Sequence, residues 1–111
     1  MVAARDAYLG RVKDMVLDAV GAYPVTVYLF GSFARGDIRR TSDVDVAVEP
    51  HGPLPVSILT NLRDALEEST IPYRVDIVDL SATDRAFRER VRKEGIVWKD
   101  CANESTSPPK R

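Results

Sequence analysis

The apolar positions of the chain divide into segments with helical spacing and segments with the character of strands. Between residues 3 and 22, apolar side chains recur every three or four positions while charged side chains fall largely on other faces. This pattern predicts an amphipathic helix that ends near Gly21. Residues 25 to 30 are β-branched, aromatic or leucine and lie between Pro24 and Gly31, so we expect a short buried strand.

Two further strands are expected, and both contain aspartates. In residues 43 to 49, valines alternate with Asp43 and Asp45. Alternation along a strand places the valines on one face and the two carboxylates on the other. In residues 73 to 78 a carboxylate, Asp76, is set among apolar neighbours. Each of these strands therefore carries acidic side chains within an apolar pattern.

Helices and loops fill the remaining segments. Residues 50 to 55 contain three prolines and a glycine, which favours a loop, and residues 56 to 69 repeat apolar side chains with helical spacing. Ser81 or Thr83 is expected to cap a third helix that ends at Gly95. The order of elements predicts an α/β or α+β domain, a small mixed β-sheet flanked by helices, and leaves the order of the strands open.

The domain is expected to occupy residues 1 to 99. Residues 96 to 98 form a short apolar segment that would close the domain by packing on its core. Residues 100 to 111 contain three serines or threonines, two prolines and few large apolar groups, so we expect a disordered tail. A chain of 111 residues supports one hydrophobic core, which suggests that a second protein supplies part of the substrate specificity.

Composition and charge narrow the range of partners. Sixteen basic and seventeen acidic residues leave a net charge of −1, so direct binding to nucleic acid is not expected. No apolar run approaches the roughly 18 to 20 residues of a membrane span, and no basic and apolar leader opens the chain. The single cysteine, Cys101, fits a reducing cytoplasm, where we expect the protein to act.

The aspartates of the second predicted strand suggest a metal site. Asp43 and Asp45 are two positions apart on one face, so their carboxylates repel each other unless a cation neutralises them. A divalent ion such as Mg²⁺ suits such a pair, because it binds carboxylate oxygens together with water and substrate phosphates. The lack of clustered histidines and cysteines argues against zinc. The simpler alternative is that the pair lies on the wet face of a half-exposed strand.

The turn Gly31-Ser32 directly follows the first predicted strand. Glycine permits a sharp turn with close backbone approach, and a serine hydroxyl with freed backbone amides can hold phosphate oxygens. Arg35 lies one helical turn further on and is placed to reach the same phosphates, whereas Arg39 and Arg40 fit a solvated loop equally well. The alternative is a plain strand-ending turn, since neither Gly-Lys-Ser/Thr nor Gly-x-Gly-x-x-Gly is present.

Together these residues resemble a known signature. Gly31-Ser32, ten further residues and then Asp43-Val44-Asp45 look like the signature of the polymerase β-like nucleotidyltransferases. Residues 31 to 37 resemble the minimal, stand-alone branch of that superfamily, and the likeness extends over residues 5 to 98. The resemblance implies the polymerase β-like nucleotidyltransferase fold and an enzyme that transfers a nucleoside monophosphate and releases pyrophosphate.

The resemblance also implies roles for individual residues. The Gly-Ser turn would cradle the triphosphate of ATP, and Asp43 and Asp45 would bind two magnesium ions. Asp76 would complete a catalytic acidic triad near the attacking hydroxyl and favour its deprotonation. Asp79 is the other candidate for the third acid, but alternation puts it on the opposite face from Asp76, and its place at the strand's end is more typical of a turn or cap.

The most specific function implied is transfer of AMP from ATP to a hydroxyl of a partner protein. Members of the minimal branch are commonly paired with a helical HEPN-type toxin that cleaves RNA, and neutralise it as antitoxins, in some cases by attaching AMP to a toxin tyrosine. We therefore expect a hetero-oligomer with such a toxin. Two alternatives are a catalytic subunit that modifies a small molecule with a helical substrate-binding protein, and an antitoxin that binds without catalysis.

Overall fold

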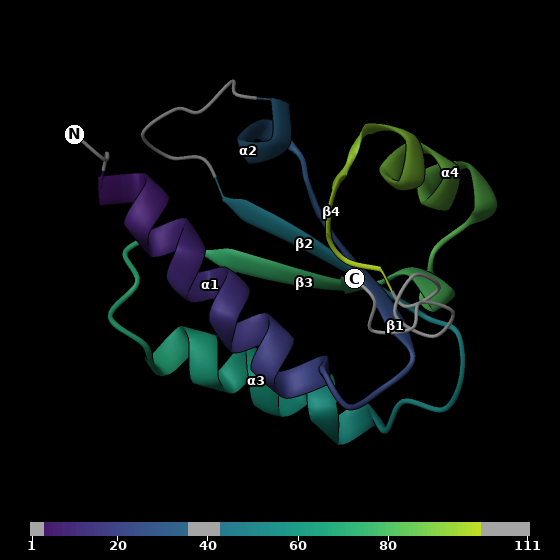
Figure 1. Ribbon diagram of the computed structural model, residues 1–111, viewed down its shortest axis with the longest axis horizontal. Coiled ribbons are helices and arrows are strands. Elements are labelled where there is room, and N and C mark those ends of the chain that lie inside the picture. Colours follow the sequence, from purple (N-terminus) through teal and green to yellow (C-terminus); the bar gives the residue numbers. More distant parts are fainter. Residues whose placement is uncertain (1–3, 36–42, 101–111) are drawn as a thin grey trace, which may run out of the picture.

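Helices and strands alternate along the chain (Figure 1). The computed structural model describes residues 4–35 and 43–100. Its elements are α1 (Ala4–Val20), β1 (Val25–Phe30), α2 (Ser32–Arg35), β2 (Val44–Pro50), α3 (Val56–Glu68), β3 (Val75–Asp79), the 3-10 turn η1 (Leu80–Ala82), α4 (Arg85–Glu94) and β4 (Ile96–Lys99). The predicted mixture of helices and strands is confirmed, and the predicted closing segment is a fourth strand, β4.

The four strands form one mixed sheet in the order β3-β2-β1-β4. β1 pairs antiparallel with β2 and with β4, whereas β2 pairs parallel with β3. A parallel pair needs a crossover connection, and the chain makes it through α3. The two strands that carry the predicted acidic residues, β2 and β3, are therefore direct neighbours, and β3 forms one edge of the sheet.

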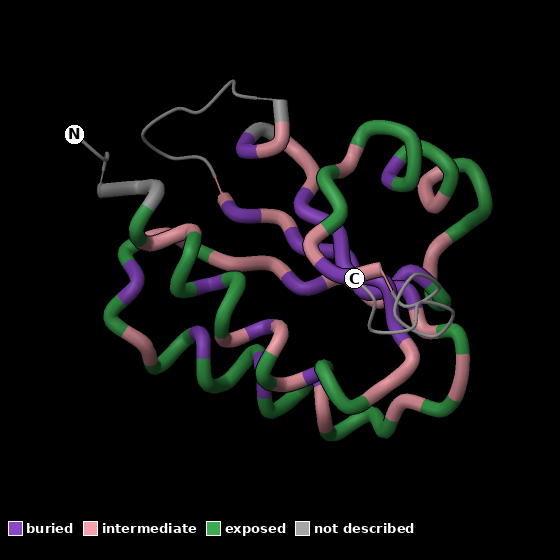
Figure 2. Tube along the Cα trace, in the orientation of Figure 1, coloured by how far each residue is buried: buried purple, intermediate pink, exposed green. Residues whose placement is uncertain are grey.

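Helices cover both faces of this sheet. α1 and α3 pack side by side on one face, and α4 lies on the other (Figure 1). In the larger core, apolar side chains of α1 and α3 meet the inward face of the sheet, and Figure 2 shows the buried residues along the strands and the inner sides of these helices. The predicted inward face of β2 is confirmed, since Val44, Val46 and Val48 are fully buried.

A smaller core fills the space between the sheet and α4. Phe30 of β1 and Phe87 of α4 meet edge to face, with ring centroids 5.7 Å apart. On the face of β2 that bears Asp45, the later residues Ala47 and Glu49 are buried, whereas Asp45 itself is only half-buried. The buried members of this core are Tyr28, Ala47, Leu80 and Val91.

The start of α4 differs from the prediction. Neither Ser81 nor Thr83 caps this helix, because η1 intervenes and the hydroxyl of Thr83 donates to the carbonyl of Leu80 at 2.8 Å. The cap is Asp84, whose carboxylate accepts a hydrogen bond from the backbone N–H of Phe87 at 2.8 Å. The predicted end of the helix is confirmed, since α4 stops just before Gly95.

The last described strand, β4, lies at the end of the sheet opposite β3. β4 leaves Ile96 and Val97 about half exposed, while Trp98 packs against the larger core. All but the first residue of the predicted disordered tail lies outside the described residues, as does Cys101. Within the part of the chain that the structure describes, no helix is both long and apolar enough to cross a membrane.

Candidate active site

The chain turns sharply at Gly31, where β1 gives way to α2. Gly31 has a φ of +77°, a left-handed conformation that residues with a side chain adopt only at a cost. A Cβ atom here would also overlap the carboxylate of Asp45. Glycine is therefore required both by conformation and by space. The side chains of Ser32 and Arg35 lie outside the described part of the structure, so their contacts with phosphate stay predictions.

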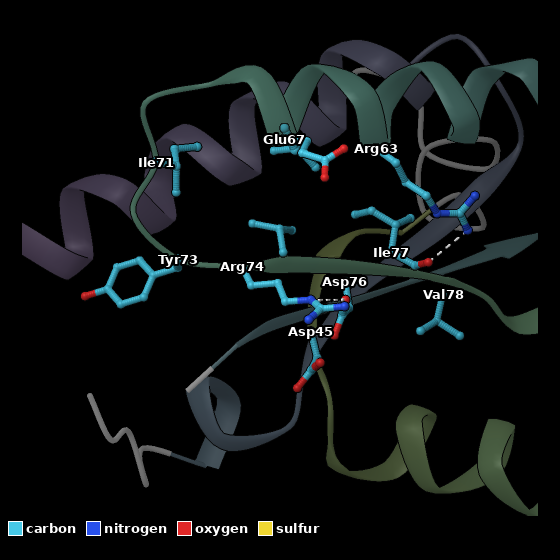
Figure 3. A pocket seen from close by; sticks show the side chains of 11 residues that line it. Asp45, Arg63, Glu67, Ile71, Tyr73, Arg74, Asp76, Ile77 and Val78 are labelled. Carbon is cyan, nitrogen blue, oxygen red and sulfur yellow. Dashed lines mark hydrogen bonds and ion pairs between the residues drawn. The ribbon is translucent and has the colours of Figure 1, made fainter. Parts of the chain in front are cut away.

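Asp45 and Asp76 lie opposite each other on β2 and β3. They are register partners in the parallel pair. Partners in neighbouring strands point to the same face of a sheet, and the strands lie about 4.8 Å apart. Both residues are half-buried, and Figure 3 shows their side chains on one side of β3. The fold thus brings together two of the three predicted acids, which lie far apart in the sequence.

The third predicted acid, Asp43, immediately precedes β2 and is half-buried. The backbone beside it is fixed, because the N–H of Val44 donates to the carbonyl of Arg74 at 2.8 Å. Among the described residues, no group of three His, Cys, Asp or Glu side chains is arranged to hold a metal ion. The structure therefore assembles a pair of carboxylates, and the part of Asp43 in a triad stays a prediction.

This pair of carboxylates has the donor chemistry that Mg²⁺ requires. Carboxylate oxygens are hard ligands, and Mg²⁺ usually keeps several waters and takes substrate phosphates in place of a complete protein cage. The carboxylate of Asp45 lies directly against the backbone of Gly31, in the space that a Cβ of residue 31 would take. Asp45 and Asp76 therefore suit a metal ion that is also bound by the phosphates of a nucleotide.

The side chain of Arg74 lies beside one member of the acidic pair, Asp76. Nε of Arg74 lies 3.5 Å from Oδ1 of Asp76, and the two side chains are 78% and 43% exposed. An ion pair so long and so open to water is weak. Sequence reasoning missed Arg74, although it lies two positions before Asp76 and alternation favours the same face. Arg39 and Arg40, which the sequence left between a phosphate contact and a solvated loop, lie outside the described residues.

A cavity of about 770 Å³ lies along β3 next to the acidic pair. Asp45 and Asp76 line it together with Arg63 and Glu67 of α3, as Figure 3 shows. Arg63 Nη2 donates to the carbonyl of Ile77 at 2.9 Å and so occupies a backbone acceptor of this edge strand. The carboxylates therefore open onto a space large enough for a substrate group. Neither Arg63 nor Glu67 was predicted as part of the site.

Asp79, the alternative third acid, is engaged elsewhere. Its Oδ1 accepts hydrogen bonds from the backbone N–H of Ser81 at 2.9 Å and from the hydroxyl of Ser81 at 2.6 Å. These bonds cap η1. The expectation that Asp79 acts as a cap is confirmed, and Asp76 is the acid of β3 that lies beside Asp45.

A second carboxylate of β2, Glu49, lies on the same face as Asp45 but is only 7% exposed. The hydroxyl of Tyr28 donates to it at 3.1 Å. The side chain of Arg92 on α4 binds it through Nε at 3.0 and 3.3 Å and also through Nη2. The hydrogen bond from Arg92 holds the pKa of Glu49 below its usual value. Burial, followed by the nearby charge of Glu49, raises the pKa of Tyr28 to about 12.

Two arginines of α4 have partners within the fold. Arg92 ties the helix to the sheet through Glu49, and Arg88 donates to the backbone carbonyls of Leu80 and Thr83 at 3.3 and 2.6 Å.

A mixed sheet that places two carboxylates on adjacent strands beside a glycine turn is the arrangement expected of a nucleotidyltransferase. The chain matches the family described as "Polymerase beta, Nucleotidyltransferase" over residues 21–101. It belongs to this family, and the predicted fold and enzyme class are confirmed.

Known proteins agree with this assignment. The Haemophilus influenzae protein named "Probable protein adenylyltransferase MntA" is 37% identical over 89 residues, which make up 80% of this chain and 76% of that protein. A chain in the crystal structure of a toxin-antitoxin with AMP-PNP has a TM-score of 0.65 at 24% identity, with 85% of this chain and 77% of that chain covered. A chain in the solved structure of a tri-AMPylated Shewanella oneidensis HEPN toxin in complex with MNT antitoxin has a TM-score of 0.62 at 20% identity, with 91% and 76% covered. The two structures show that the fold is shared.

Proposed function

We propose that this protein is an Mg²⁺-dependent adenylyltransferase that transfers AMP from ATP to a hydroxyl group of a partner protein. The observation that carries this proposal is the register pairing of Asp45 with Asp76 beside the bare backbone of Gly31. Such a pair suits a metal ion that is shared with a triphosphate. The name of the Haemophilus influenzae relative and the AMP-PNP of a structurally similar complex support ATP as the donor.

The partner in this proposal is a HEPN-type toxin, which the protein neutralises in the cytoplasm as its antitoxin. Support comes from two structurally similar chains, because both belong to solved toxin-antitoxin complexes and one of these contains a tri-AMPylated HEPN toxin. The cavity of about 770 Å³ beside the carboxylates leaves room for a side chain that projects from such a partner.

The triphosphate is proposed to bind at the turn that follows β1. Gly31 offers close approach to its backbone, while Ser32 and Arg35 supply a hydroxyl and a guanidinium as phosphate donors. A guanidinium suits this task because it forms two parallel hydrogen bonds with phosphate oxygens. Holding the donor phosphate in line with the acceptor hydroxyl accounts for much of the catalysis in such transfers.

Asp43, Asp45 and Asp76 are the proposed catalytic acids and the ligands for two Mg²⁺ ions. When bound, these ions neutralise charge on the leaving pyrophosphate and make the acceptor hydroxyl easier to deprotonate. The acceptor oxygen bonds to the α-phosphorus, the bond to pyrophosphate breaks and the hydroxyl proton is released. Asp76 is proposed to favour that release, since it lies on the edge strand and lines the cavity.

Label transfer tests the proposal directly. The purified protein is incubated with Mg²⁺, with the product of the gene adjacent to its own, and with ATP labelled either at the α- or at the γ-phosphorus. We expect label on the partner from α-labelled ATP and none from γ-labelled ATP. Asp45→Asn should lower the transfer at least about a hundredfold, as loss of one group that stabilises the transition state does elsewhere. Asp64→Asn, at an exposed position of α3, is the control.

Two results would contradict the proposal and favour an alternative. Label on a small molecule of a cell extract, with none on the neighbouring protein, would indicate a catalytic subunit for small molecules. Full neutralisation of the neighbour by an Asp43→Ala/Asp45→Ala variant, with no label transfer by the unmodified protein, would indicate an antitoxin that acts by binding alone.

A further inference from the structure

We propose that Arg74 is an internal counter-cation, which pairs with Asp76 in the metal-free protein and limits how tightly a divalent cation binds to the acidic pair. The inference rests on the proposed function, because it takes Asp45 and Asp76 as metal ligands. It adds a residue that tunes the site without itself contacting the reacting atoms, so Arg74 is a positioning residue.

The backbone fixes where this guanidinium originates. The carbonyl of Arg74 accepts a hydrogen bond from the N–H of Val44 at 2.8 Å, which extends the pairing of β2 and β3 by one step. Arg74 and Asp76 are two positions apart, so both side chains leave the same face of this segment. The position therefore directs a positive charge to the end of the sheet where the two carboxylates lie.

The contact between Arg74 and Asp76 is weak enough for a metal ion to displace it. Nε of Arg74 lies 3.5 Å from Oδ1 of Asp76, which is longer than a charge-assisted hydrogen bond, and 78% of the arginine side chain is exposed. Exposed pairs of this kind contribute little to stability. A divalent cation that binds both carboxylates directly is therefore a stronger partner for Asp76 than the guanidinium.

The surroundings leave the displaced side chain in water. Arg74 lines the cavity of about 770 Å³ along β3 (Figure 3), and 78% of its side chain is exposed. The guanidinium can thus leave Asp76 without losing contact with water.

Removal of the charge on Arg74 should strengthen metal binding. A guanidinium that remains beside the site repels a divalent cation, and in a largely aqueous environment with salt we expect this to weaken binding by about three- to tenfold. Arg74→Gln should therefore bind Mn²⁺ about three- to tenfold more tightly than the unmodified protein. Arg74→Lys, which keeps the charge, should restore the original affinity.

Manganese titration followed by electron paramagnetic resonance measures this affinity without any turnover. The chain provides a close control, because Arg85 pairs with Glu89 on α4 at the same 3.5 Å and its side chain is 85% exposed. Arg85→Gln removes an equivalent charge at a distance from the acidic pair and should leave the Mn²⁺ affinity unchanged. Asp45→Asn identifies the site, since it should weaken Mn²⁺ binding.

Thermal unfolding gives a second readout. In EDTA, Arg74→Gln should unfold about 2 to 4 °C lower than the unmodified protein, because the counter-charge on Asp76 is lost. In saturating Mn²⁺ this difference should disappear, since the metal ion then supplies the charge. A difference that persists in Mn²⁺ would overturn the proposal by showing that Arg74 acts only as a structural residue.

The binding data separate the inference from the function on which it rests. If the unmodified protein binds Mn²⁺ through Asp45 and Arg74→Gln binds it equally or more weakly, the inference is overturned and the metal site stands. If Mn²⁺ does not bind, or binds equally well to Asp45→Asn, the metal site and the inference are overturned together.

Discussion

The two ends of β2 carry carboxylates on the same face of the sheet, but the surroundings of these carboxylates differ. Glu49, at the end of the strand, is buried and is bound by Tyr28 and Arg92. Asp45, at the start, is half-buried, lies beside Asp76 and lines an open cavity. One carboxylate is neutralised within the fold, and the other is placed where a ligand can reach it.

The contrast between the two arginines follows the same division. Arg92 reaches Glu49 from a helix that packs on the sheet and binds both carboxylate oxygens. Arg74 reaches Asp76 through one nitrogen at 3.5 Å from a side chain that is mostly in water. The multidentate ion pair of Arg92 with a buried carboxylate is part of the structure, whereas the single exposed contact of Arg74 is the one that we propose a metal ion replaces. The comparison teaches that residue type alone does not distinguish a proposed catalytic acid from a structural one.

The largest effect should come from Gly31→Ala. The added Cβ atom would overlap the carboxylate of Asp45, and the alanine would have to adopt a positive φ. Either the turn or the carboxylate must therefore move. We expect at least about a hundredfold loss of AMP transfer, since displacements near 1 Å can cost that much, and about 1 to 3 kcal/mol of stability. Label transfer and urea unfolding measure the two effects.

The control for this change is Gly10→Ala, where an added Cβ has nothing within 4 Å and lies within α1. This substitution should leave transfer unchanged and should not destabilise the protein, because alanine is the better helix former. Equal transfer by Gly31→Ala and the unmodified protein would contradict the assignment of this turn to the active site.

The next largest effect concerns stability at the other end of β2. Glu49→Gln removes the charge that Arg92 and Tyr28 share and should cost about 1 to 3 kcal/mol of unfolding free energy, as lost hydrogen bonds to buried charged groups do. AMP transfer per folded molecule should change little. Glu68→Gln, at the exposed end of α3, is the control in both measurements. If Glu49→Gln lost AMP transfer without losing stability, the assignment of a purely structural role to Glu49 would be contradicted.

The smallest effect should be a difference in pH dependence. The pKa of Glu49 is lowered in the folded state, mainly by its hydrogen bond with Arg92, so its contribution to stability is present above the usual value of 4.5 and is lost as the pH falls below it. The pKa of Tyr28 is raised from 10.0 to about 12, so its contribution is present below pH 10 and is lost as the pH rises toward 12.

Urea unfolding at a series of pH values measures both changes. As the pH falls below 4.5, Glu49→Gln should lose less stability than the unmodified protein, because the glutamine side chain does not take up a proton. Tyr28→Phe should likewise lose less stability than the unmodified protein above pH 10. Parallel curves for the variants and the unmodified protein would contradict these assignments.

The candidate site residues that could be predicted from local pattern are those that lie close together in the sequence. The glycine turn and the pair Asp43 and Asp45 follow from local spacing, because strand alternation and backbone freedom depend only on neighbours in the chain. The strand order was left open, so the register that places Asp45 opposite Asp76 could not be obtained from alternation. Family resemblance, in contrast, selected Asp76 without that geometry.

The remaining contacts depend on tertiary structure. Arg63 reaches the edge of β3 only because α3 crosses beside that strand, and Arg92 meets Glu49 only because α4 packs on the opposite face. The helix cap was misplaced for a local reason. Ser81, Thr83 and Asp84 are all residues that favour caps, and the intervening η1 decides which one is used.

The parallel pairing of β2 with β3 also affects when the candidate active site can form during folding. β1 and β2 form an antiparallel pair and are close in the chain, whereas α3 separates β2 from β3 in the sequence. Pairings between distant segments form slowly, because the intervening chain must be ordered first. We therefore expect β1 and β2 to associate early and the two carboxylates to meet in a late step. A newly made chain would have a core before it has its candidate catalytic centre.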